Sequence, residues 1–226
     1  MPTLVIGNKL YSSWSMRPWL LLKHFGVAFE EIVIPLDMPN TKSQILKHSP
    51  AGKVPVLIDG DVTVFETIAI MEYAGDALGV RSWPDDRKAR AMARSVAAEM
   101  HAGFSALRNA CPVNLGKKFP QRDRGPAIAR EVARFAEIVS QARGRHGQSG
   151  PFLFGTFGAA DAMFAPLATR LETYSIAVDP QTRAYVDAIL ALPAFQEWRT
   201  AALKEKWVVA EDEVDEEPIE VYRQAA

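Results

Sequence analysis

The chain has 226 residues, of which 48% are apolar and 23% charged, a composition typical of a globular protein with a buried core. Its formal net charge of −1 offers no overall attraction to nucleic acid or to an anionic membrane surface, and no apolar stretch is long enough to cross a bilayer. The single cysteine, Cys111, excludes an intramolecular disulfide and a multi-cysteine metal site. We therefore expect a soluble cytoplasmic protein that binds neither nucleic acid nor membrane.

The first 79 residues alternate between strand-like and helix-like segments. Runs of branched apolar residues predict four strands, at residues 3–7, 29–35, 55–59 and 62–65. Helical spacing and stop signals predict three helices, at residues 17–25, 42–49 and 67–78. The order β-α-β-α-β-β-α requires a parallel pair with a right-handed crossover, followed by an antiparallel hairpin. This part is therefore predicted to be an α/β domain with a mixed sheet.

The rest of the chain is dominated by helical spacing. Residues 80–88 form the predicted linker, and helices are predicted at residues 89–110, 127–143, 159–174, 182–191 and 194–204, with a loop at 144–150. Residues 211–217 contain six acids and are predicted to be solvated or mobile. We expect an all-α domain over residues 89–226.

A turn rich in hydroxyl groups, Ser12-Ser13-Trp14-Ser15, joins the first predicted strand to the first helix. Ser12 and Ser15 stand where a C-x-x-C redox motif has its cysteines, so this turn cannot exchange disulfides. A hydroxyl beside the free N–H groups of a helix start can stabilise an anion. Serines also cap helices for structural reasons alone, and we expect Ser15 to be the cap and Pro18 to lie in the first turn.

Two further junctions carry residues suited to binding. Val54-Pro55 follows a loop with Lys53 and begins a strand, where a proline can adopt a cis bond. Glu66-Thr67 joins a strand to a helix, and it can either cap the helix or recognise an ammonium and a carboxylate group.

Together these features resemble the glutathione transferase superfamily, of the cytosolic type with a serine in the active site. The serine turn is similar to the S-S-C-S-W-R stretch of the zeta class, residues 48–55 resemble its N-P-x-x-x-V-P loop, and residues 66–73 resemble E-S-x-A-I-x-x-Y. Residues 155–161 resemble the G-x-x-[ST]-x-A-D signature of the second domain. The resemblance implies a thioredoxin-like N-terminal domain, an all-α C-terminal domain and a homodimer.

The resemblance also implies a role for each residue. Ser12 would activate the glutathione thiol, with Ser13, Ser15 and Arg17 as possible support. Glutathione would be bound as co-substrate, without a metal, by Lys53, Val54, Glu66 and Thr67. The pocket for a small electrophilic second substrate would be lined by Trp14, His101, Arg108 and Asn114.

Some positions depart from the family pattern. Trp14 replaces the zeta-class cysteine and Met16 its tryptophan, so the acceptor chemistry stays open between glutathione transfer and zeta-like cis–trans isomerisation. Gly158 replaces the serine or threonine opposite Asp161, which leaves that capping box incomplete. A non-catalytic protein of the same fold that binds ligands or partners is the alternative.

Overall fold

A computed structural model describes residues 1–148 and 150–223. Its N-terminal region is built on a four-stranded sheet in the order β2-β1-β3-β4. The strands are β1 (Thr3–Ile6), β2 (Glu30–Val33), β3 (Val56–Asp59) and β4 (Val62–Phe65). β1 runs parallel to β2 and antiparallel to β3, and β3 and β4 form the hairpin. The predicted mixed, thioredoxin-like sheet is confirmed.

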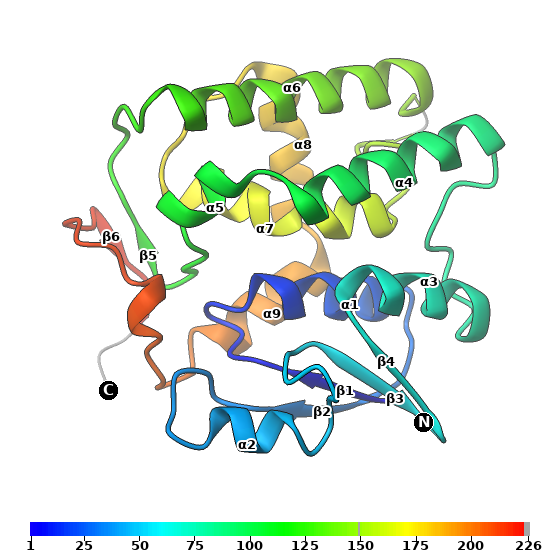
Figure 1. The fold of residues 1–226 in the computed structure, drawn as a ribbon. Helices are drawn as coiled ribbons and strands as arrows, with labels where there is room; N and C mark the ends of the chain where they lie inside the picture. Colours follow the sequence, from blue (N-terminus) through cyan, green and yellow to red (C-terminus); the bar gives the residue numbers. More distant parts are fainter. Residues whose placement is uncertain (149, 224–226) are drawn as a thin grey trace.

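Helices cover both faces of this sheet (Figure 1). α1 (Ser13–His24) and α3 (Thr67–Ala77) lie on one face, and the short α2 (Thr41–Ile45) lies on the other. The side chains of β1 alternate accordingly: Leu4 and Ile6 belong to the main core, whereas Val5 packs in a smaller cluster with Ile45.

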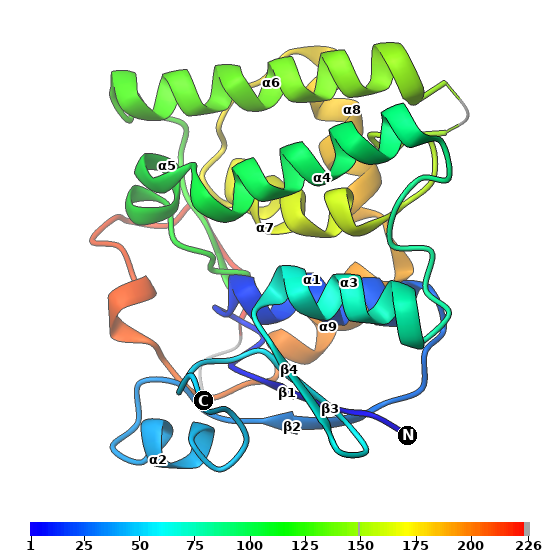
Figure 2. The same cartoon turned by 45° about the vertical axis from the view of Figure 1, so that its right-hand side comes forward.

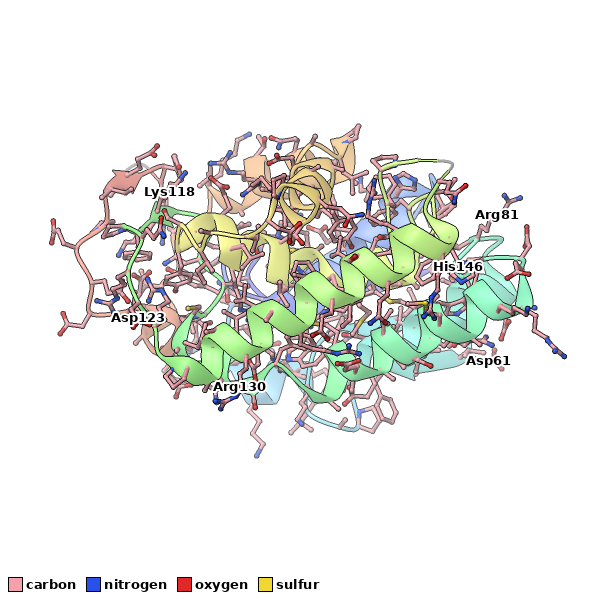
Figure 3. The ribbon with its side chains drawn as sticks, turned by 90° about the horizontal axis from the view of Figure 1, so that it is seen from above. Asp61, Arg81, Lys118, Asp123, Arg130 and His146 are labelled. Carbon is pink, nitrogen blue, oxygen red and sulfur yellow. The ribbon has the colours of Figure 1, made fainter. Side chains whose placement is uncertain are left out.

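The C-terminal region is a layered set of helices, as predicted. They are α4 (Arg87–Ala102), α5 (Ser105–Ala110), α6 (Pro126–His146), α7 (Ala159–Thr173), α8 (Pro180–Leu190) and α9 (Pro193–Ala202). α7 is buried along its length and packs against α1, α4 and α8, while α9 lies beside α1 (Figure 2). α6 forms the outer layer and carries Arg130 and His146 (Figure 3). No helix in the described part of the chain is long and apolar enough to cross a membrane.

The prediction of a single helix at residues 89–110 is wrong, because the helix is interrupted between α4 and α5. A Cβ at Gly103 would lie 2.8 Å from the Glu99 carbonyl oxygen, and Phe104 has a left-handed φ of 57°. The new helix start is capped from a distant helix, since the Glu131 carboxylate accepts hydrogen bonds from two α5 amides, at 3.1 and 2.7 Å. This partner lies some 25 residues away and leaves no local signal.

The start of α1 also differs from the prediction. Ser12, rather than Ser15, is the N-cap residue, and Pro18 lies in the second turn of the helix. Because Pro18 has no N–H, it cannot donate to the carbonyl of Trp14 four residues earlier. The hydroxyl of Thr67, at the start of α3, donates to this carbonyl at 3.1 Å instead. The proline therefore creates an acceptor that links the two helices.

The acidic segment 211–217 is solvated only in part: Glu211, Asp215 and Glu217 are exposed, whereas its other acids are half-buried and the segment carries regular structure. It contains the 3-10 turn η1 (Ala210–Asp212), and beyond it β6 (Glu220–Val221) pairs with β5 (Lys117–Lys118), a strand that was not predicted. The Glu216 carboxylate accepts two hydrogen bonds from Arg124, at 2.8 and 3.0 Å. Distant basic residues thus neutralise part of the acidic run. Residue 149 of the predicted loop and residues 224–226 of the predicted helical domain lie outside the described residues.

The N-terminus of α7 has one half of a capping box and one additional main-chain partner. Asp161 Oδ2 accepts a hydrogen bond from the Gly158 amide at 3.0 Å, which is one half of the box. The Ser82 carbonyl accepts a different free amide of the helix start, that of Ala159, at 2.8 Å. A Cβ at residue 158 would lie 3.0 Å from the same carbonyl oxygen, so glycine allows this close approach. Burial raises the pKa of Asp161 to about 6.

Candidate functional site

A cavity of about 340 Å³ opens between the starts of α1 and α3 on one side and α4 and α5 on the other. Its volume suits a small-molecule ligand. Of the residues predicted for the site, the structure brings the following to its wall: Trp14, Lys53, Val54, Glu66, Thr67, His101 and Arg108. Phe65 and Ala51, which the sequence did not single out, complete part of the lining. Residues from both regions of the molecule therefore meet in one cavity.

The start of α3 presents opposite charges to this cavity. Glu66 has a φ of 71°, unusual for a residue with a side chain, and its side chain is about half exposed, at 52%. Thr67 is buried, and its hydroxyl is committed to the Trp14 carbonyl. The first N–H groups of a helix have no partner inside it and favour an anion. This junction can therefore hold an ammonium group on Glu66 and a carboxylate on the α3 amides.

The loop before β3 supplies a free stretch of main chain. The Val54–Pro55 peptide bond is cis, and the ladder of β3 with its neighbours begins only at Val56. Val54 makes no backbone hydrogen bond to another described residue. Its N–H and C=O groups can therefore pair with the backbone of an extended peptide, and the exposed Lys53 beside them can meet a carboxylate.

The serine turn lies behind the edge of the cavity formed by Trp14. Ser12 is 8% exposed, and its Oγ lies 2.8 Å from the Oγ of the buried Ser15, which accepts the Gly7 amide at 3.0 Å. A hydroxyl hydrogen can rotate, so Ser15 can act as the donor in this pair and leave the Ser12 hydrogen free. Ser13 is half-buried, and its hydroxyl has no hydrogen bond to a described residue. Neither Ser12 nor Ser13 forms part of the cavity wall.

Two of a group of three arginines, Arg17 and Arg108, pack against the Trp14 ring and form no ion pair with a described carboxylate. The guanidinium carbons of Arg17 and Arg108 lie 4.2 and 4.6 Å from the centre of the Trp14 ring. Arg17 is fully buried, and although its Nε donates to the Met163 carbonyl at 3.0 Å, its Nη1 and Nη2 have no partner in the described part of the chain.

The third arginine, Arg170, is also buried and acts on the same cluster. Burial, followed by the charges of Arg170 and Arg108, lowers the pKa of Arg17, and burial with Arg108 lowers the pKa of Arg170 to about 10. Arginine nevertheless stays protonated in proteins, so the cluster is positive at neutral pH. This side of the site therefore favours an anion.

His101 and Arg108 bring the C-terminal helices to the cavity. The His101 ring meets the Trp14 ring edge-on at 5.1 Å, and its Nε2 lies 3.9 Å from Glu66 Oε2. Arg108 reaches back to the carbonyls of His101 and Gly103, both at 3.4 Å. The Trp14 ring thus contacts His101 and Arg108 of the C-terminal region as well as Arg17 of α1.

Asn114 lies elsewhere, so its predicted place in the second-substrate pocket is wrong. It is buried, its Oδ1 accepts the Gly116 amide at 2.9 Å, and its Nδ2 donates to Glu213 at 3.1 Å. It borders a separate cavity beside Tyr11. Within the described residues, no group of three His, Cys, Asp or Glu side chains is placed to hold a metal ion.

The chain is similar to known proteins in sequence. Residues 11–77 match the family model of the glutathione S-transferase N-terminal domain. The chain is 26% identical to the maleylacetoacetate isomerase of Rattus norvegicus over 208 residues, which cover 86% of this chain and 90% of that protein. It is 38% identical to glutathione S-transferase F10 of Arabidopsis thaliana over 74 residues, 32% of this chain and 34% of that one.

Solved structures share the whole fold. A Burkholderia glutathione transferase homolog with bound glutathione superposes with a TM-score of 0.66 at 23% identity, covering 89% of this chain and 97% of that one. The tau-class glutathione S-transferase of mango, Mangifera indica, superposes with a TM-score of 0.67 at 20% identity, covering 89% and 95%. Residues 11–77 thus match the glutathione S-transferase N-terminal domain, and the chain shares the fold of these solved structures.

Proposed function

We propose that the protein is a glutathione transferase, which holds glutathione in the 340 Å³ cavity and presents its thiolate to a small electrophile. The observation that carries the proposal is the meeting of three elements at this cavity: the charged start of α3, the free main chain at Val54 and the start of α1, which lines the cavity with Trp14 and carries the serine hydroxyls behind it. Each corresponds to one part of the tripeptide.

Glutathione would extend along the cavity with its γ-glutamyl end at α3. The Glu66 carboxylate attracts the ammonium group, and the amides at the start of α3 attract the carboxylate. The cysteinyl unit pairs with the main chain of Val54, and Lys53 meets the glycyl carboxylate. This orientation directs the thiol toward the serine turn.

The energetics of thiol ionisation favour a hydroxyl donor. A free thiol has a pKa of about 8.5, and lowering it by two units requires about 2.7 kcal/mol of preference for the anion. A helix N-terminus contributes typically ~0.3–1 kcal/mol, and a hydrogen bond to a charged group roughly 1.5–3 kcal/mol. The two together suffice, and the charges of Arg17, Arg108 and Arg170 act in the same direction.

Ser12 is the donor we propose, with Ser15 behind it. In this arrangement the Gly7 amide donates to Ser15, and the two serine hydroxyls, whose oxygens lie 2.8 Å apart, rotate so that Ser15 donates to Ser12 and Ser12 donates to sulfur. Successive hydrogen bonds polarise one another, which strengthens the last one. Ser12 keeps its own proton throughout. The half-buried Ser13 is the competing donor.

The acceptor would bind over Trp14, between His101 and Arg108. The similarity to rat maleylacetoacetate isomerase keeps a glutathione-dependent isomerisation as a second candidate, since both reactions begin from the thiolate. A non-catalytic glutathione-binding protein is favoured by one observation, the low exposure of Ser12. Homodimer formation and a cytoplasmic location stay predictions.

The test is the binding of glutathione to the purified protein, measured by calorimetry, followed by ultraviolet absorbance of the bound thiolate as a function of pH. We expect binding and a thiol pKa near 6.5, about two units below that of the free thiol. Binding with an unshifted thiol pKa supports the non-catalytic alternative. No binding at all refutes the proposed function.

A further inference from the structure

The C-terminal segment from Glu205 to Tyr222, which we call the C-terminal strap, runs along one side of both regions (Figure 1). It touches the loop of residues 8–11, which directly precedes Ser12. We propose that Glu205 and Glu213 of this strap are positioning residues for the serine turn. This inference rests on the proposed function, because it assigns to the strap the geometry of the thiol-activating hydroxyl.

Glu205 binds the loop through its main chain. One carboxylate oxygen accepts the Lys9 amide at 2.8 Å, and the other accepts the Leu10 amide at 3.0 Å. The next two amides along the chain, those of Tyr11 and Ser12, donate to the Asn8 carbonyl at 3.3 and 2.8 Å. Half of these four amides therefore depend on a residue almost 200 positions away.

Glu213 binds the loop through the side chain next to Ser12. The Tyr11 hydroxyl donates to Glu213 Oε1 at 2.6 Å, and burial together with Glu213 raises the pKa of Tyr11, so this hydroxyl stays protonated. Asn114 and Lys117 of the C-terminal region donate to the same carboxylate at 3.1 and 2.6 Å. Glu213 thereby joins Tyr11 to fixed points outside the N-terminal region.

Other hydrogen bonds also hold the loop. The Trp198 indole donates to the Lys9 carbonyl at 2.9 Å, and the Leu115 amide reaches the Leu10 carbonyl at 3.3 Å. Both also come from the C-terminal region of the chain. Two further bonds come from the N-terminal region: Lys9 Nζ donates to Glu31 at 2.6 Å, and the Leu36 amide donates to Asn8 Oδ1 at 2.7 Å. A hydrogen bond weakens steeply as its geometry departs from the ideal, so a small movement of this loop changes how Ser12 meets sulfur. The strap therefore acts on the thiol pKa through Ser12 and without touching glutathione.

The experiment compares Tyr11→Phe and Glu213→Gln with Glu217→Gln. Each removes one hydroxyl or one charge and keeps the size of the side chain, and Glu217 is an exposed strap residue with no hydrogen bond to another described side chain. The ultraviolet titration of bound glutathione and the pH profile of kcat are measured for all three. We expect the first two variants to raise the thiol pKa by about half to one unit and to lower kcat at pH 6.5 about two- to fivefold, with recovery at higher pH.

The outcomes separate positioning from mere stabilisation. Glutathione affinity should change less than about twofold, and Glu217→Gln should behave as the unmodified protein. A lower melting temperature with an unchanged thiol pKa in both Tyr11→Phe and Glu213→Gln would overturn the proposal. If the unmodified protein binds no glutathione, the proposed function fails on its own. Amide hydrogen exchange at residues 9–15 then decides, since positioning requires faster exchange in Tyr11→Phe and equal exchange would refute it.

Discussion

Two helices begin at the same cavity, and they are built in opposite ways. The start of α1 is buried, with Ser12 and Ser15 bonded to one another and the preceding loop bound by α9 and the strap. The start of α3 is open, with the Glu66 side chain about half exposed and the backbone of this residue in the left-handed region. The first helix start is held in place from several directions, whereas the second leaves its charges for a ligand.

The difference matches the tasks that we propose for the two helices. Stabilising a thiolate requires one hydroxyl at one distance, and fixed partners make this donor precise without reorganisation. Recognising the zwitterionic γ-glutamyl end of glutathione requires charged groups that are hydrated in the free protein and exchange this water for the ligand on binding. The hydrogen bond from Thr67 to the Trp14 carbonyl joins the two helix starts, so each sets the place of the other.

The largest effect is expected at the buried start. Ser12→Ala removes a hydrogen bond to a charged sulfur worth about 1.5–3 kcal/mol, so kcat/KM at neutral pH should fall roughly 10- to 150-fold. Steady-state kinetics as a function of pH measure it, with Ser95→Ala on the exposed face of α4 as control. A greater loss in Ser13→Ala than in Ser12→Ala would transfer the donor role to Ser13.

The link between the two helix starts is tested by a double-mutant cycle. Thr67→Val leaves the Trp14 carbonyl without a donor and should lower the free energy of unfolding by about 1–2 kcal/mol. Pro18→Ala restores an N–H that can reach the same carbonyl, so Thr67→Val should cost less in that background. Urea denaturation of the four proteins measures the coupling, and equal costs in both backgrounds would contradict it.

The open start should respond in binding rather than in rate. Glu66→Gln keeps the shape of the side chain and removes its charge, and because the side chain is half exposed we expect a loss of about 1 kcal/mol. The KM for glutathione should rise about fivefold with little change in kcat. Asp61→Asn in the turn of the β3–β4 hairpin is the control. A fall in kcat at unchanged KM would contradict the proposed recognition role.

The smallest effect is expected in the C-terminal strap, which contacts the loop that precedes α1. Burial raises the pKa of Asp212 from 3.8 to about 6, so the folded protein holds this proton more tightly than the unfolded chain. The carboxyl therefore favours the folded state most at low pH, and this advantage is lost as pH rises toward 6. Asp212→Asn should match the unmodified protein at pH 4 and be more stable above pH 6, by less than about 1 kcal/mol. Urea unfolding at several pH values measures this difference, and a difference that grows toward acid pH would contradict it.

The parts of the fold that could be predicted are those with local causes. Branched apolar runs indicated β1, β3 and β4, and the hairpin around Gly60 followed from its turn residues. Most residues of the cavity wall could also be predicted, because they stand at junctions between a strand and a helix. The start of α3 at Glu66-Thr67 is an example.

The parts that could not be predicted depend on distant partners. The break at Phe104 is capped by Glu131 of α6, and the strap is ordered by residues about a hundred positions away. Pro18 was expected in the first helical turn, where its missing N–H would need no replacement. In the structure the hydroxyl of Thr67, on another helix, replaces that donor, and nothing near Pro18 in the sequence indicates this. Asn114 was misplaced for the same reason, since its partner Glu213 belongs to the strap.

The carbonyl that caps α7 has a consequence for protein engineering. Ser82 lies between α3 and α4; its hydroxyl donates to the Met71 carbonyl at 2.7 Å, and its own carbonyl accepts the Ala159 amide. These two hydrogen bonds fix the length and position of the connection between the two halves, so it does not act as a flexible linker. Chimeras that exchange halves with relatives should be joined after residue 86, and a one-residue insertion at residues 80–82 should be tolerated far less well than one in the exposed hairpin turn at Gly60.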